Sequence, residues 1–90
     1  MEIVRQATAG TFESSDAYVT VSPSDTLEIK LDSVVYNQYA QAITCAVKQT
    51  LDEMKVTRGL VSVKDRGALD CVIQARVETA VLRASEGGRK

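Results

Sequence analysis

The spacing of apolar residues changes at Ser33, and this change restricts the chain to a mixed architecture. Before it, Leu27, Ile29 and Leu31 alternate with polar residues, which is the period of a strand with one face in water. Beyond it, apolar residues recur every three or four positions along one face of a long helix, for which Ser33 is the expected N-cap. The residues on this face are Val35, Tyr39, Ile43, Val47, Leu51 and Met54. One domain therefore has to combine strands with helices.

Two further strand candidates precede this change. Residues 3–9 and the β-branched stretch 18–22 both suit strands, while residues 10–16 between them favour turns. Residues 23–25 end the second run with a proline and turn-forming side chains. We therefore expect residues 18–22 and 27–31 to pair as a hairpin.

One more strand and one more helix are expected after the long helix. Residues 57–59 should end that helix, residues 60–64 are short and β-branched like a strand, and residues 65–67 suit a turn. A second helix should follow over about residues 68–84. Its expected buried face consists of Leu69, Val72, Ile73, Val77, Ala80 and Val81. The polar, glycine-rich stretch 85–90 predicts a frayed end.

The resulting order is strand, strand, strand, helix, strand, helix. This order favours an α+β fold with an antiparallel or mixed sheet and two helices packed on one face. Ninety residues are enough for one domain with a single core. We expect that domain over residues 1–85, followed by a flexible tail over residues 86–90.

Composition argues against several classes of function. A formal net charge of -1 provides no basic field for a phosphate backbone, so nucleic-acid binding by charge is not expected. No stretch approaches the roughly 20 apolar residues of a membrane span, and the first residues do not resemble a signal peptide. A cytoplasmic protein without a membrane partner is expected. The two cysteines, Cys45 and Cys71, lack metal-ligand spacing and suit free thiols, Cys45 on the polar face of the long helix and Cys71 in a structural position.

Residues 10–16 place Ser14 between two carboxylates, those of Glu13 and Asp16, in a chain without histidine. Serine is a weak nucleophile at its own pKa, and its usual activating base is a histidine. Ser14 is therefore better suited to be an attachment point, modified by another protein, than a hydrolase nucleophile. The alternative is turn chemistry, in which the hydroxyls of Ser14 and Ser15 bond nearby backbone and Asp16 caps the next segment.

Two segments together resemble a known family. Residues 9–16 (AGTFESSD) and residues 65–76 (DRGALDCVIQAR) resemble the acyl carrier, or gamma, subunit of bacterial citrate lyase, in the same order and at the same spacing. The similarity extends from Met1 to about Ser85. Phe12 stands where a leucine is expected and Gln74 where an aliphatic residue is expected, and neither change removes the serine or its acidic neighbours.

This resemblance implies a cofactor and a division of labour. It implies that Ser14 bears 2'-(5''-phosphoribosyl)-3'-dephospho-CoA through a phosphodiester, on whose thiol acetyl and citryl thioesters form during citrate cleavage to acetate and oxaloacetate. Those reactions belong to alpha and beta subunits, so the chain would be a non-catalytic carrier in a hetero-oligomer, without a metal. A dedicated transferase would attach the group. The expected fold differs from the four-helix bundle of the familiar acyl carrier proteins.

Two other functions are compatible with these residues. One is a carrier of the same kind in malonate decarboxylase, with the same prosthetic group, and the other is a non-carrier interaction or regulatory domain. Ser15 could replace Ser14 as acceptor. Glu13 and Asp16 could steer a transferase, although they would repel phosphates.

Several polar and aromatic residues have simpler structural interpretations. Asp65 suits a turn, and Asp70 suits the first turn of a helix, where a carboxylate is favourable. Arg76 interrupts an apolar helical stretch and should bury its stem with the guanidinium in water, or else hold a phosphate or a partner's carboxylate. Tyr36 and Tyr39 are expected in the core or at its rim.

Overall fold

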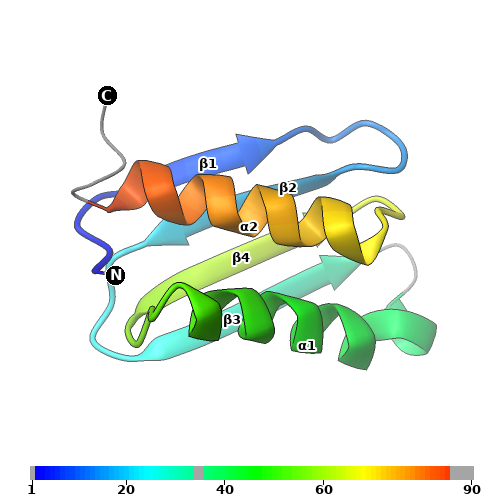
Figure 1. Cartoon of the computed structure of the whole chain (residues 1–90). Coiled ribbons are helices and arrows are strands. Elements are labelled where there is room, and N and C mark those ends of the chain that lie inside the picture. Colours follow the sequence, from blue (N-terminus) through cyan, green and yellow to red (C-terminus); the bar gives the residue numbers. More distant parts are fainter. Residues whose placement is uncertain (1, 34–35, 86–90) are drawn as a thin grey trace.

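The chain folds into two layers, a four-stranded sheet and two helices that cover one of its faces (Figure 1). The computed structural model describes residues 2–33 and 36–85, and only the backbone of residues 36–39. The elements are β1 (Ala7–Gly10), β2 (Ala17–Ser22), β3 (Leu27–Ser33), α1 (Tyr36–Glu53), β4 (Gly59–Asp65) and α2 (Asp70–Ala84). The predicted α+β class, element order and one-sided packing of the helices are confirmed.

The order of strands in the sheet is β1-β2-β4-β3. β1 and β2 form an antiparallel hairpin, β2 pairs antiparallel with β4, and β3 pairs parallel with β4. The predicted hairpin between residues 18–22 and 27–31 is therefore wrong, because β4 lies between those two strands. Parallel strands require a long crossover connection, and α1 provides it between β3 and β4.

The predicted alternation of apolar and polar residues in β3 is present, but its apolar residues are only half-buried. Leu27, Ile29 and Leu31 point to the helical side and are half-buried, while the polar residues between them are exposed. Val61 and Val63 of β4, the register partners of Ile29 and Leu31, are fully buried. This difference follows from position, since β3 is an edge strand and β4 is paired on both sides.

The core lies between the sheet and the two helices. On α1, Ile43, Val47 and Leu51 are buried and Met54 is half-buried, as the periodicity predicts. Val35 lies outside the described residues, and so do the side chains of Tyr36 and Tyr39. Cys45 is exposed on the opposite face, as expected.

Helix α1 is shorter than its sequence pattern suggests. Ser33 is the last residue of β3 rather than an N-cap, and its hydroxyl donates to Asp65 Oδ2 at 2.7 Å. At the other end, the amide of Val56 donates to Leu51 O and Lys55 adopts a positive φ of 59°. This six-to-one closure ends the helix at Glu53. The expected terminator Gly59 instead begins β4.

Helix α2 confirms most of the predicted buried face. Ile73, Val77, Ala80 and Val81 are fully buried, whereas Val72 is half-buried. Leu69 is 71% exposed, so its assignment to this face is wrong. Leu69 precedes the helix with an extended backbone (φ -71°, ψ 157°), and helical spacing does not apply to it. Asp70 lies in the first turn as expected.

The N-terminal segment packs on the end of α2 and does not extend β1 back to residue 3. Ile3 forms an isolated bridge with Ser85, and the amides of Val4 and Arg5 donate to Ala84 O. Arg5 Nη1 also donates to Ser85 O at 2.6 Å. Ser85 is buried, so the frayed end that composition predicts does not include it, and residues 86–90 lie outside the described residues.

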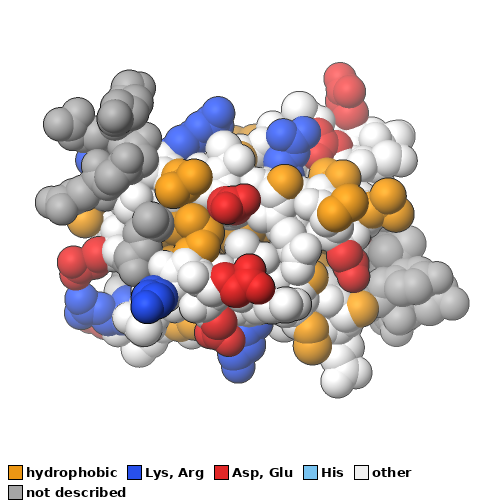
Figure 2. Space-filling view, viewed as in Figure 1, with side chains coloured by type: hydrophobic (Ala, Val, Ile, Leu, Met, Phe, Trp, Pro, Cys, Tyr) orange, Lys and Arg blue, Asp and Glu red, His pale blue; other side chains and the backbone are white. Residues whose placement is uncertain are grey.

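Charges of both signs are interspersed over the helical face (Figure 2). Within the described ranges, neither helix has the length and hydrophobicity needed to cross a membrane.

A matched pair of leucine substitutions tests this packing. Leu51→Ala should lower the free energy of unfolding by about 2–5 kcal/mol, because Leu51 is fully buried and its truncation leaves a cavity. Leu69→Ala should change it by less than about 0.5 kcal/mol, because Leu69 is exposed. Urea unfolding of both variants measures the difference, and equal losses would contradict the position found for Leu69.

Candidate functional site

Ser14 lies in the connection between β1 and β2, at the end of the molecule opposite the N-terminus (Figure 1). Residues 11–15 are all exposed. Within the described part of the chain, no group forms a hydrogen bond with the hydroxyl of Ser14 or of Ser15. The turn interpretation therefore fails for these two hydroxyls, and Thr11 and Asp16 organise the loop in their place.

The loop is pinned to the β4–α2 connection by its backbone. The amide of Ser15 donates to Arg66 O at 2.8 Å, and the amide of Arg66 donates to Asp16 O at 2.9 Å. The amide of Asp16 donates to Glu13 O at 3.2 Å and closes a turn with Ser14 and Ser15 at its centre. Ser15 adopts a positive φ of 65°, which is uncommon for a residue other than glycine. The loop is thus held in a defined conformation while its serines face solvent.

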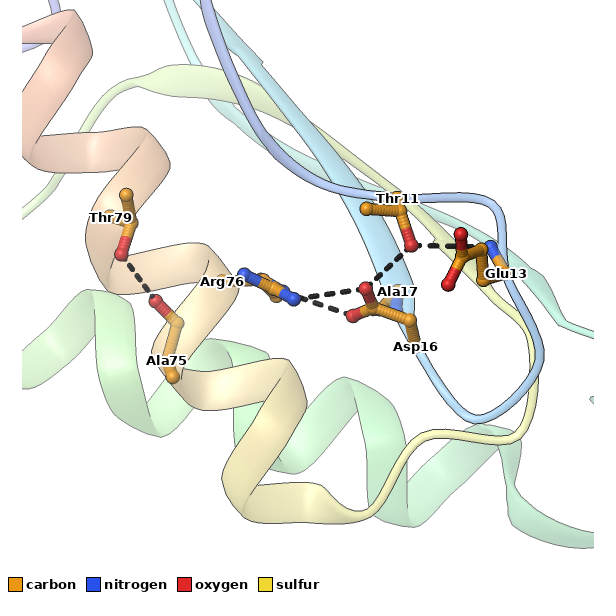
Figure 3. Close-up of polar contacts among 7 residues, drawn as sticks. All are labelled: Thr11, Glu13, Asp16, Ala17, Ala75, Arg76 and Thr79. Atoms are coloured by element: carbon orange, nitrogen blue, oxygen red, sulfur yellow. Dashed lines mark hydrogen bonds and ion pairs between the residues drawn. The ribbon is translucent and has the colours of Figure 1, made fainter.

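Asp16 is the main polar anchor of the loop (Figure 3). Arg76 of α2 reaches its carboxylate with two hydrogen bonds of 2.9 Å, from Nε to Oδ1 and from Nη2 to Oδ2. Thr11 Oγ1 donates to Oδ2 at 2.6 Å, and the amide of Ala17 donates to Oδ1 at 2.7 Å. Such fork-like pairing is the strongest geometry available to an arginine and a carboxylate.

These contacts set the electrostatics around Ser14. The hydrogen bonds from Arg76 and then from Thr11 hold the pKa of Asp16 well below its usual range, and Asp16 in turn raises the pKa of Arg76. Glu13, across the described residues, has no cationic partner. The negative charge beside Ser14 that no described cation balances is therefore that of Glu13.

The pairing of Arg76 corrects its sequence interpretation. Arg76 does not simply extend into water, and the carboxylate that it holds belongs to its own chain, not to a partner. The two residues are 60 positions apart, so no local pattern connects them. The only available signal was an arginine within an apolar helical stretch.

Gly10, the last residue of β1, directly precedes the loop and has no room for a side chain. Its φ is +100°, and a Cβ at this position would lie 1.8 Å from Ala17 O and 3.2 Å from Arg76 Cδ. Ala17 is buried and paired within the sheet, so its carbonyl cannot move away. Only glycine fits here.

Asp65 fixes the connection on which the loop rests. Its Oδ1 accepts hydrogen bonds from the amides of Gly67 and Ala68, at 3.2 and 2.8 Å. Ser33 donates to Oδ2, so this buried carboxylate joins the end of β3 to the connection between β4 and α2. The turn role predicted for Asp65 is confirmed.

The remaining candidate residues do not assemble a second site. Among residues 2–33 and 36–85, no group of three or more His, Cys, Asp or Glu residues could hold a metal ion. Cys71 lies in the first turn of α2, as expected, and is an exposed free thiol like Cys45.

Comparisons with known proteins find relatives over nearly the whole chain. The family described as "Malonate decarboxylase delta subunit (MdcD)" matches residues 4–84. The citrate lyase acyl carrier protein of Pectobacterium atrosepticum is 50% identical over 97% of this chain and 92% of its own length. That of Enterobacter sp. (strain 638) is 52% identical over 96% and 90%, and that of Haemophilus influenzae (strain PittEE) is 46% identical over 96% and 90%.

One solved structure has a similar fold at low identity. A chain in the crystal structure of a Pseudomonas malonate decarboxylase hetero-tetramer in complex with malonate superposes with a TM-score of 0.78. The match covers 92% of this chain and 87% of that chain at 20% identity. This likeness concerns the fold alone.

Two glycine substitutions test the steric limit at the start of the loop. Gly10→Ala should destabilise the protein by about 1–3 kcal/mol more than Gly67→Ala. Both glycines have positive φ, but a Cβ at Gly67 would meet nothing within 4 Å, so that variant incurs only backbone strain. Thermal and urea unfolding give the comparison, and equal losses would show that the Ala17 carbonyl can yield.

The Asp16–Arg76 pair should make stability depend on acid pH. The folded pKa of Asp16 is lowered from 3.8, so its contribution is complete above that value and declines as pH falls below it. Urea unfolding between pH 6 and pH 3 should show a smaller acid loss for Asp16→Asn than for wild type. Glu13→Gln is the control, since it removes a carboxylate without a cationic partner and retains the Asp16 contribution. Identical acid profiles of wild type and Asp16→Asn would refute this assignment.

Proposed function

Because this chain belongs to the family of the citrate lyase acyl carrier proteins, it is a carrier subunit and not an enzyme by itself, and we propose that Ser14 bears its prosthetic group. The main observation behind this proposal is that the Ser14 loop is fixed in position while the Ser14 hydroxyl is accessible. Its backbone is pinned at Arg66 and its side chains at Arg76, while the Ser14 hydroxyl is exposed and has no hydrogen-bond partner within the described residues. A modifying enzyme needs an acceptor that is both accessible and held in place.

An acyl carrier requires a covalently attached prosthetic group, and we propose 2'-(5''-phosphoribosyl)-3'-dephospho-CoA. The residues present fit an anionic attachment at Ser14, because the charge of Asp16 is already balanced by Arg76. The group supplies a terminal thiol that can hold an acyl group as a thioester. The chain contributes the hydroxyl and a rigid base, and the Glu13 side chain is the remaining local source of repulsion.

Attachment of the group to Ser14 is a substitution at phosphorus. Ser14 Oγ forms a bond to the phosphorus of a phosphoanhydride donor, the bond from phosphorus to its phosphate leaving group breaks, and the serine proton leaves to the transferase or to water. With no histidine in the chain, the base that accepts this proton is best supplied by the transferase.

A carrier works by bringing its arm to other subunits. A flexible tether converts each acyl exchange into an intramolecular encounter, with effective concentrations of order millimolar. We propose the citrate lyase alpha and beta subunits as partners in a hetero-oligomer, and the cytoplasm as its location. The exposed free thiols of Cys45 and Cys71 suit a reducing compartment.

The second candidate function is that of the acyl carrier subunit of malonate decarboxylase. The family description and the fold of the Pseudomonas structure favour it. Three proteins named citrate lyase acyl carrier protein are 46–52% identical to this chain over nearly its full length, and these identities favour the carrier role in citrate lyase. Co-purification with catalytic subunits and assay of the complex with each substrate separates the two. Oxaloacetate formed from citrate supports the first candidate, and carbon dioxide released from malonate supports the second.

Intact mass tests Ser14 as the attachment residue. Wild-type protein expressed with the modifying enzymes should be heavier than its sequence by one nucleotide-containing adduct. Ser14→Ala should lose the adduct completely, because it lacks the acceptor oxygen. Ser15→Ala is the matched control and should retain it. An adduct on Ser14→Ala, or its loss from Ser15→Ala with Ser14 unmodified, would move the site to Ser15.

A further inference from the structure

Four large apolar side chains are strongly exposed within the described ranges, and they divide between the two ends of the molecule. Phe12 and Leu69, 53% and 71% exposed, lie at the end that carries Ser14, which we call the attachment end: residues 11–16 and 66–69. Val4 and Leu82, 42% and 39% exposed, lie near the other end of α2: Leu82 is in its last turn, and the amide of Val4 donates to Ala84 O. Figure 2 shows hydrophobic side chains at the surface of the attachment end.

Phe12 is presented rigidly beside the attachment serine. It lies two residues before Ser14, and its ring stacks on that of Tyr18 with centroids 4.4 Å apart and planes 27° apart. Tyr18 belongs to β2 and is paired with Lys64 of β4. The stack therefore fixes one face of the Phe12 ring on the sheet, while the residue as a whole is 53% exposed.

Leu69 flanks the serine loop from the helical side. The connection that carries it is fixed at Asp65 Oδ1 and bonded to the loop through the backbone of Arg66. Leu69 is three residues from Arg66, a distance of at most about 11 Å even for an extended chain. It also borders an open groove of about 650 Å³, whose other apolar lining residues are Ala42, Ile43, Ala68 and Cys71.

We propose that Phe12 and Leu69 are the two apolar anchors through which the transferase that modifies Ser14 binds this carrier. This inference rests on the proposed function. Large apolar side chains on ordered backbone lose little entropy when a partner covers them, and such residues dominate binding energy at interfaces. Phe12 stacks on Tyr18 on the face of the sheet without helices, and Leu69 directly precedes α2 on the helical face. The two residues therefore flank the attachment end from its two faces, and a partner that encloses this end contacts both.

The chemistry selects the transferase rather than the catalytic subunits. A transferase has to bring a donor phosphorus within bonding distance of Ser14 Oγ, which forces its surface onto the attachment end. The catalytic subunits act on a thiol at the far end of a long arm. They can therefore reach their substrate without covering Phe12 or Leu69.

Steady-state kinetics of modification test the anchors. Unmodified carrier is the varied substrate, with purified transferase and its nucleotide donor, and adduct formation is followed by mass. Phe12→Ala and Leu69→Ala should each raise the KM for the carrier about tenfold with little change in kcat. Val4→Ala and Leu82→Ala are matched controls at the other end and should leave both constants unchanged. Phe12→Leu should restore a KM near wild type, because the site requires apolar contact.

The outcomes separate this inference from the function on which it rests. Wild type that never acquires an adduct contradicts the carrier assignment itself. Wild type that is modified, with an unchanged KM for both anchor variants or an equal rise in the Val4 and Leu82 controls, overturns the anchors and leaves the carrier assignment intact. A fall in kcat alone also overturns them, since it indicates a disturbed loop. Circular dichroism and melting of each variant confirm that it is folded.

Discussion

The central position of β4 is the constraint on which the rest of the molecule depends. Because β4 pairs with both β2 and β3, the connection that leaves its end lies beside the β1–β2 loop. The backbone of Arg66 can then bond Ser15 and Asp16. Helix α2 follows directly and packs over β1 and β2, which brings Arg76 to the carboxylate of Asp16. Strand order thus places the Ser14 loop beside the β4–α2 connection, and backbone hydrogen bonds join the two.

Different residues hold the loop in place and present its exposed hydroxyl. Hydrogen bonds from Thr11 and Arg76 to the Asp16 carboxylate hold the loop, whereas the Ser14 hydroxyl has no hydrogen-bond partner within the described residues. A residue that only carries a group needs position and access, and the chemistry can be performed by other subunits at the end of the arm. This arrangement suits a chain without histidine in a family of acyl carriers, and the ion pair with Arg76 offsets the charge of Asp16 beside the proposed attachment serine.

Much of this architecture was accessible from periodicity, because period and burial have the same local cause. The alternation at Leu27 to Leu31 and the helical spacing from Ile43 to Leu51 report which side of each element meets the core. Periodicity did not predict where the helices begin and end. Leu69 keeps the helical spacing but precedes the helix, and Lys55 ends α1 by a backbone conformation that does not require glycine. End geometry depends on hydrogen bonds that spacing does not encode.

The sequence by itself determined the class and order of the elements, and the motif around Ser14 that places the chain in its family. Only the tertiary structure decided which strands are neighbours, that Asp16 and Arg76 form an ion pair, and that Phe12 and Leu69 lie at the same end of the molecule. The reason is physical: periodicity describes how each segment contacts a core, whereas pairing depends on which distant segment occupies the adjacent position. A contact across 60 residues has no local signature, and here such contacts hold the functional loop.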